Sequence, residues 1–258
     1  MPTTFTHDLF GQEVYRKLPE QIRHMIRRNG SLYRIGLHGP DILFYYHLYK
    51  NPVNQLGVQI HQEPAKPFFE RGIRLVRENK DEALLVYLLG FACHFLLDST
   101  CHPYIGTIES KVTHTLIEKE LDRVLMEENG KDPFHYYPSC CIRPSRPAAQ
   151  TIQRMFPTLK TKTIYQSLVM MKRTTNLMVY RDSLGQKGIL FLLKAAGQQK
   201  LADHIMKKEK DPSLDPYLLE LKKLFWKARE EAPALLESVI HAVKTQDALP
   251  ERFARNYE

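Results

Sequence analysis

The sequence predicts an all-α fold that forms a single domain over residues 1–258. Two observations favour this class. Apolar residues recur at every third or fourth position along most of the chain, which is the spacing of one helical face. No segment keeps the alternation of period two that strands show, and the β-branched residues are scattered. Because no repeat, low-complexity tract or change of composition marks a domain boundary, the whole chain is assigned to one large domain.

Five segments of the N-terminal half have helical periodicity: residues 13–28, 40–50, 66–79, 81–101 and 109–130. Pro19 is expected to divide the first of them. Pro40 suits the first turn of the second, because its fixed φ is already helical. Asp81 is a good cap for the fourth, which is apolar nearly all round and therefore predicts a central, buried helix. Pro103 is expected to end that helix just after His102.

The C-terminal half predicts five further helices, near residues 147–155, 162–180, 188–202, 217–231 and 232–244. Two segments between helices favour loops. Residues 131–146 are rich in proline and aromatic side chains, and residues 207–216 combine charged residues with two prolines. This half contains no motif that indicates a chemistry.

The bulk composition is that of a globular protein with a basic surface. The chain is 43% hydrophobic and 26% charged, with a formal net charge of +8 and a pI of about 9.2. That charge favours anionic partners such as phosphate esters, nucleic acid or acidic lipid surfaces. No signal peptide is visible and no run approaches the roughly 18 apolar residues of a membrane span, so the expected location is cytoplasmic.

The four cysteines indicate neither a disulfide framework nor a thiolate zinc ribbon. Cys93 and Cys101 lie in an apolar helical run, and Cys140 and Cys141 are adjacent, so no CxxC pair exists. We expect buried free thiols, as in a reducing cytosol.

Ionisable residues in the predicted central helix are the main functional signal. His94 and Asp98 are four residues apart, so they lie on one helical face, and His102 continues that stripe. His114 and Glu118 repeat the spacing on the next helix. Ionisable groups in a core are costly unless they are paired or bind a metal. Two neighbouring helices with these side chains form a nitrogen and oxygen ligand cage that suits zinc, with iron, manganese or cobalt as alternatives.

Three further residues carry a weaker signal when each is taken alone. Asp41 opens an aromatic-rich predicted helix, where a carboxylate also complements the helix dipole. His7 and His61 are single histidines in loops or at helix ends, a pattern that is not specific for metal binding. Together, however, the order His7, Pro40-Asp41, His61, His94-x3-Asp98, His102, His114-x3-Glu118 resembles the bacterial zinc-dependent phospholipase C family.

The resemblance implies an all-α enzyme that hydrolyses phosphodiester bonds of phospholipids at a trinuclear zinc site. Carried over to this chain, one zinc ion would be bound by Asp41, His61, His94 and Asp98, and a second by His102, His114 and Glu118. His7 would hold a third zinc ion together with Asp98 as a bridge, and Asp41 would also be the candidate general base. The secreted enzymes complete the third site with an N-terminal tryptophan. This chain starts with Met1 and its one tryptophan is Trp226, so two zinc ions are expected and the third stays open.

The expected function is therefore a metal-dependent phosphodiester hydrolase that acts on a phospholipid headgroup or another phosphate ester, with contact to an inner-membrane surface. A related alternative is a single-strand nuclease; the net charge suits nucleic acid, but that fold also relies on an N-terminal tryptophan, so nucleic acid is the less favoured substrate. A di-iron bundle would need Glu-x-x-His spacing, which these ligand pairs lack. The remaining alternative is a non-catalytic, basic helical binding protein with a structural metal in a closed shell.

Overall fold

Every regular element in the part of the chain that the structure describes is a helix, which confirms the predicted all-α class. The computed structural model describes residues 4–47, 49–179, 184–195, 197, 205–206 and 210–258. The α-helices are α1 (Thr4–Lys17), α2 (Glu20–Arg28), α3 (Gly30–Gly36), α4 (Pro52–Gln62), α5 (Ala65–Asn79), α6 (Glu82–Ile108), α7 (His114–Glu128), α8 (Arg146–Gln153), α9 (Thr161–Leu177), α10 (Leu184–Ala195) and α12 (Asp215–Thr245). Short 3-10 helices are η1 (Gly39–Tyr45), η2 (Pro138–Cys141), η3 (Pro212–Leu214) and η4 (Glu251–Ala254).

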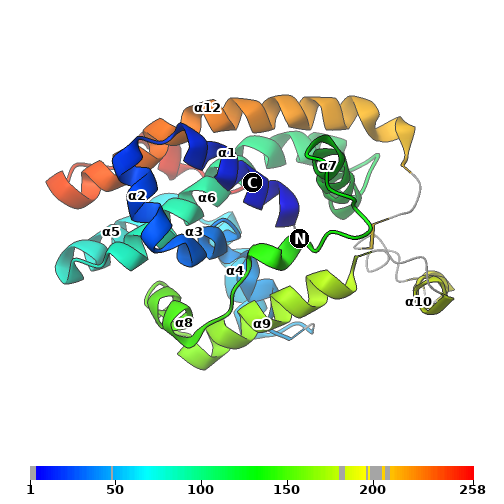
Figure 1. Cartoon of the computed structure of the whole chain (residues 1–258), viewed down its shortest axis with the longest axis horizontal. Coiled ribbons are helices and arrows are strands. Elements are labelled where there is room, and N and C mark those ends of the chain that lie inside the picture. The colour runs from blue at the N-terminus through cyan, green and yellow to red at the C-terminus, as the bar shows by residue number, and fades with distance from the viewer. Residues whose placement is uncertain (1–3, 48, 180–183, 196, 198–204, 207–209) are drawn as a thin grey trace.

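Helix α6 runs through the middle of the molecule, and α1, α2, α3, α5, α7, α8 and α12 pack against it (Figure 1). The side chain of Asp81 caps it by accepting a hydrogen bond from the backbone N–H of Leu84 at 3.0 Å, as predicted. By length and composition α6 could cross a membrane, but 94% of its most apolar 18-residue window is buried inside the protein. It is therefore the core helix around which this fold is built.

The prediction that Pro103 ends the central helix is wrong, because α6 continues to Ile108. Pro103 itself is exposed. Beyond it, Ile105 and Ile108 are buried and extend the apolar face of the helix. Burial of those two side chains outweighs the backbone hydrogen bond that a proline removes.

Helices α3 and α6 approach so closely that their backbones are in contact. A Cβ atom added to Gly90 of α6 would lie 2.2 Å from the carbonyl oxygen of Tyr33, and one added to Gly36 of α3 would lie 2.4 Å from that of Tyr87. Only glycine fits at such a crossing. The chain leaves α3 at this point, so the close approach places the next turn against α6.

The segment predicted as a helix over residues 40–50 is instead the 3-10 helix η1, which ends at Tyr45. The side-chain amide of Asn54, on α4, donates hydrogen bonds to the carbonyls of Leu43, Phe44 and Tyr46 at 2.9, 3.1 and 3.2 Å. These carbonyls are satisfied from outside, so they need no continuing helix. His47 then turns the chain away with φ of 54°.

Other boundaries differ from the predicted ones where packing overrides local signals. The helices expected over 217–231 and 232–244 are one helix, α12, because buried residues on both sides of Pro233 continue the same face. Helix α1 starts at Thr4 rather than at residue 13, and α7 starts at His114 after the cap Thr113. Helices α3 and α4 were not predicted.

The predictions for α2, α5, α8 and α9 agree with the structure within a few residues, whereas α10 covers Leu184–Ala195 in place of the predicted 188–202. Parts of the predictions over 162–180, 188–202 and 207–216 lie outside the described residues. Three of the four cysteines are buried free thiols as expected, whereas Cys140 is exposed. The buried apolar side chains form one core cluster that includes residues from Phe5 to Tyr257.

Candidate metal centre

Asp98 lies at the centre of the ionisable cluster on α6. One carboxylate oxygen, Oδ2, is 3.0 Å from Nε2 of His94, one helical turn earlier, and the other, Oδ1, is 3.2 Å from Nε2 of His7. His61 and His102 approach the same carboxylate at 3.8 Å each. A single buried carboxylate therefore faces four imidazoles, which is a suitable position for a residue shared between metal ions.

His7 reaches this cluster because Asp122 of α7 fixes the start of α1. The Asp122 carboxylate accepts hydrogen bonds from the backbone N–H of Thr6 at 2.9 Å, from its hydroxyl at 2.7 Å and from the N–H of Phe5 at 3.4 Å. Carboxylates suit this place because the first N–H groups of a helix have no partner within it. The His7 side chain is 3% exposed as a result of the packing of α1 on α6.

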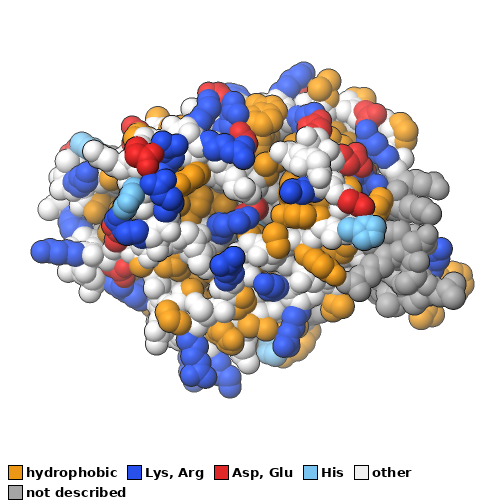
Figure 2. All heavy atoms as spheres, in the orientation of Figure 1, with side chains coloured by type: hydrophobic (Ala, Val, Ile, Leu, Met, Phe, Trp, Pro, Cys, Tyr) orange, Lys and Arg blue, Asp and Glu red, His pale blue; other side chains and the backbone are white. Residues whose placement is uncertain are grey.

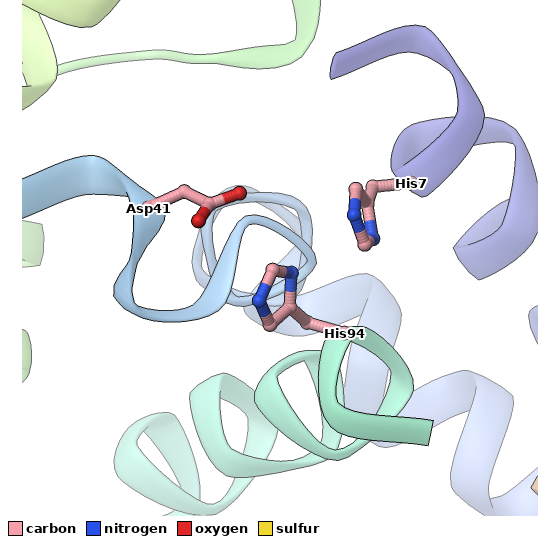
Figure 3. Close-up of side chains that lie close together, drawn as sticks. All are labelled: His7, Asp41 and His94. Carbon is pink, nitrogen blue, oxygen red and sulfur yellow. The ribbon is translucent and has the colours of Figure 1, made fainter. Parts of the chain in front are cut away.

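Asp41 is brought to the cluster by a turn that only glycine can make. Gly39 has φ of +46°, and a Cβ atom there would lie 2.1 Å from Cδ2 of His94, so the turn lies directly against that ring. Figure 3 shows that Asp41, His94 and His7 come from three different elements and face a common space. Asp41 accepts from Nε2 of His61 at 3.2 Å, while Nδ1 of His61 donates to the carbonyl of Gly57 at 2.7 Å.

Another set of side chains lies where α6 meets α7. Glu118 Oε1 is 3.0 Å from Nε2 of His114 and 3.5 Å from Nε2 of His102. The other ring nitrogens have partners of their own: Nδ1 of His114 is 2.9 Å from Glu109 Oε1, and Nδ1 of His102 is 2.9 Å from the carbonyl oxygen of Tyr257. Hydrogen bonds of this kind hold a ring so that its Nε2 is presented to a metal.

The structure brings all eight residues predicted from the sequence into three groups. Within each group, the ligand atoms lie within 4.8 Å of one another. The groups are His7, Asp41 and His94; His61, His94 and Asp98; and His102, His114 and Glu118. His94 is common to the first two. All the ligand atoms are imidazole nitrogens and carboxylate oxygens, a donor set that suits zinc.

Unsatisfied ring nitrogens fit the same assignment. Nδ1 of His94 and Nδ1 of His7 are buried and make no hydrogen bond to any described residue, and Nε2 of His94 has only the ion-pair contact with Asp98, whose angle is poor for a hydrogen bond. Poorly satisfied buried polar atoms cost free energy, and a cation coordinated at Nε2 of His94 would lower that cost. The residues present therefore fit a bound metal better than a set of ordinary buried ion pairs.

Burial and charge oppose each other at the first two groups. Burial favours the neutral acid, yet the charges of His94, His102 and His7 hold the pKa of Asp98 well below its usual range. Burial lowers the pKa of His94, although Asp98 and Asp41 oppose this shift. For His61, burial is outweighed by Asp41 and Asp98, which raise its pKa to about 9 in the absence of metal.

The same opposition holds at the third group. Burial raises the pKa of Glu118, but His114 and His102 bring it well below its usual range. Burial also disfavours charge on His114, but Glu118 and Glu109 raise its pKa to about 9. The metal-free cluster is thus a network of carboxylates and protonated histidines, and metal binding would displace those protons.

An open cavity of about 420 Å³ lies beside the cluster. Its described lining consists of His7, Asp41, Phe44, Val58, His61, Asp98, His102, Gly106, Glu109, His114, Glu118 and Glu258. Lysine and arginine side chains are spread over the face of the molecule seen in Figure 2, but neither occurs in this lining. An anionic substrate would meet five carboxylates here, so it requires bound cations to offset their charge.

Sequence reasoning missed His38 and Tyr257. His38 is fully buried behind the cluster, with Nε2 3.6 Å from Sγ of Cys141, and burial lowers its pKa to about 3. Its position three residues before Asp41 was a usable signal. Tyr257 contacts the ring of His102, which lies 155 residues earlier in the chain, and no pattern in the sequence pointed to it.

Comparison with known proteins agrees with the geometry. The sequence model of the family described as zinc dependent phospholipase C matches residues 6–172, which is more than half of the chain and includes all eight clustered residues. No curated protein and no solved structure gives a match. With its helical fold and its buried histidine and carboxylate groups, this chain belongs to the zinc-dependent phospholipase C family.

Proposed function

We propose that this protein is a zinc-dependent phosphodiester hydrolase whose substrate is a phospholipid. The observation that carries the proposal is the convergence of eight histidine and carboxylate side chains, all within the family match, at an open cavity. A structural metal is normally enclosed by four protein ligands, whereas a catalytic one keeps a position open to water or substrate. The cavity therefore supports an enzyme over a structural metal site.

Zinc would be held by the three groups of residues described above. When bound, it would stabilise charge on phosphoryl oxygens and lower the pKa of water toward about 7. Asp98 faces both the His7 side and the His102 side of the cluster, so it is the candidate bridge between ions. The two groups that contain His94 have only that residue in common, so two ions there would require His94 to bind one ion and the remaining residues to hold the other.

Asp41 is our candidate general base. It lines the cavity, and although burial opposes its ionisation, His94 and His61 lower its pKa, so it is a carboxylate at neutral pH. It can therefore accept a proton from the attacking water and align it for attack on phosphorus. In the metal-free protein, Nε2 of His61 contacts this carboxylate at 3.2 Å, and the Gly57 carbonyl fixes the His61 ring so that Nε2 faces the cluster.

Phe44 and Val58 give the cavity an apolar side next to the charged one. Such a division suits an amphiphilic substrate, whose phosphate would lie toward the histidines and whose glycerol backbone would lie toward the apolar wall. The absence of lysine and arginine from the described lining makes recognition of the phosphate depend on zinc.

The test combines zinc counting with hydrolysis. Zinc per chain is measured on the purified protein, and release of diacylglycerol is followed from phospholipid vesicles. The variant Asp41→Asn keeps a side-chain oxygen that can ligate zinc but cannot accept a proton, so it should retain most of its zinc and lose about 10²–10⁴-fold in turnover, the usual contribution of a positioned acid or base. Asp132→Asn is the matched control, since Asp132 is an exposed carboxylate in the loop after α7.

Other outcomes would decide against the proposal. Cleavage of a single-stranded oligonucleotide without release of diacylglycerol would favour a nuclease. Bound zinc with neither activity would favour a structural metal. A protein that takes up no zinc after dialysis against it would overturn the site itself.

A further inference from the structure

The last residues of the chain return to the centre of the molecule, far from the end of α12 (Figure 1). Residues 250–258, which we call the C-terminal segment, lie outside the family match and contain none of the predicted ligands. Two of their aromatic side chains, Phe253 and Tyr257, are fully buried. A segment with no ligand of its own is thus packed into the wall of the metal centre.

Tyr257 makes a backbone contact with each of two candidate ligands. Its carbonyl oxygen accepts a hydrogen bond from Nδ1 of His102 at 2.9 Å, and its N–H donates to the carbonyl of His61 at 3.1 Å. The two histidines are on different helices, α6 and α4, and belong to different ligand groups. Tyr257 therefore connects the two histidines and, through them, two of the ligand groups.

The Tyr257 ring fills the space behind the same ligands. Its centroid lies 5.3 Å from that of His61, 5.9 Å from that of His94 and 5.1 Å from that of Phe95. Since all of these side chains are buried, the rings cannot turn without displacing Tyr257.

Three further residues of the C-terminal segment hold it on its helices. The carbonyl of Arg255 accepts from the N–H of Ala65 at 2.9 Å. The Arg252 guanidinium donates to the hydroxyls of Ser99 and Thr100, one and two residues after Asp98, at 3.0 and 2.7 Å. Phe253 stacks on Phe95 with ring centroids 5.4 Å apart. The C-terminal segment is therefore attached to α5 and to α6, in addition to its contacts with the ligands.

We infer that the C-terminal segment positions the metal ligands, with Tyr257 fixing the His102 ring so that Nε2 faces the metal and tying His61 to the same backbone. This inference rests on the proposed zinc site. The physical reason is that a ligating histidine binds best when its other ring N–H has a fixed acceptor, and loss of such an acceptor typically weakens metal affinity about 10–100-fold.

The test is zinc affinity rather than activity. A chain that ends at Asn256 lacks both backbone contacts and also Glu258, which lines the cavity, so Glu258→Gln is measured beside it and should bind zinc like the parent. Tyr257→Phe keeps both contacts and most of the ring. Competition with a chromophoric chelator should show zinc affinity about 10–100-fold weaker for the shortened chain. The Tyr257→Phe variant should match the parent. If the shortened chain melts at a lower temperature in EDTA but binds zinc as tightly as the parent, the segment only stabilises the fold and the inference is overturned.

A second measurement needs no shortened chain, so it stands even if that chain does not fold. In the zinc-loaded full-length protein, nitrogen NMR of labelled histidine should show His102 protonated at Nδ1 and coordinated through Nε2. Coordination through Nδ1 would overturn the inference while the zinc site stands. A full-length protein that binds no zinc would overturn the proposed function instead.

Discussion

The contact between α3 and α6 gives the sharpest prediction about how this fold supports its candidate metal centre. The perturbation is one methyl group, introduced by Gly90→Ala in the middle of α6. The added Cβ would lie 2.2 Å from the Tyr33 carbonyl oxygen, whereas ordinary contact begins at 3.4 Å, so the two backbones would have to separate by about 1.2 Å. Neither helix can relieve the clash with a side-chain rotation, because the atom that is met belongs to the backbone.

The expected cost is at the upper end of the range for overpacked cores, about 3 kcal/mol. For a chain of this size that corresponds to a melting temperature lower by about 6–12 °C. The turn after α3 carries Gly39 and Asp41 against His94, so separation of the helices should also weaken zinc binding. Thermal unfolding in EDTA, followed by circular dichroism, measures the stability, and chelator competition measures the zinc affinity.

Gly106→Ala is the matched control, because Gly106 lies in the same helix and no atom lies within 4 Å of its added Cβ. Alanine is the better helix former, so this variant should gain about 0.5–1 kcal/mol. Opposite signs for the two alanines are the expected result. Equal melting temperatures for Gly90→Ala and the parent, or equal losses for both variants, would refute the close contact.

Three further predictions concern charge, capping and metal. In EDTA, the pKa values of His61 and His114 are raised to about 9, above the roughly 6.5 of the unfolded chain. Protonation of these two histidines therefore adds stability that is complete below about pH 6.5 and lost as the pH rises through about 9. Denaturation midpoints that do not fall over this window would contradict the ion-pair network. Asp122→Ala removes the cap of α1 and should cost about 1–2 kcal/mol in urea unfolding, with zinc affinity reduced through His7; an unchanged midpoint would count against this cap. Zinc at 1,000 times its Kd should stabilise the protein by about 4 kcal/mol over the EDTA form, and a melting temperature independent of zinc would argue that no ion binds the folded state.

Much of the fold was predictable because burial repeats with the helical period. The apolar run before His94 indicated a central helix capped by Asp81, and both features are present. Prolines were poorer guides. Pro103 and Pro233 both lie inside helices, since the buried side chains that follow them gain more from packing than the helix loses in one hydrogen bond.

The sequence alone determined the ligand types and part of their grouping. Spacing of four residues necessarily places His94 beside Asp98, and His114 beside Glu118, on one helical face, because helix geometry is local. The resemblance to a family of zinc enzymes added His7, Asp41 and His61, which local patterns could not distinguish from ordinary surface residues.

Only the tertiary structure decided how these residues meet. Whether Asp41 reaches His94 depends on the glycine contact between α3 and α6, and whether His102 is oriented depends on Tyr257, 155 residues later in the chain. Such contacts leave no periodic signal, because they are set by the packing of whole helices rather than by neighbouring residues. The sequence thus determined which chemistry the chain carries, and long-range packing determined where that chemistry is assembled.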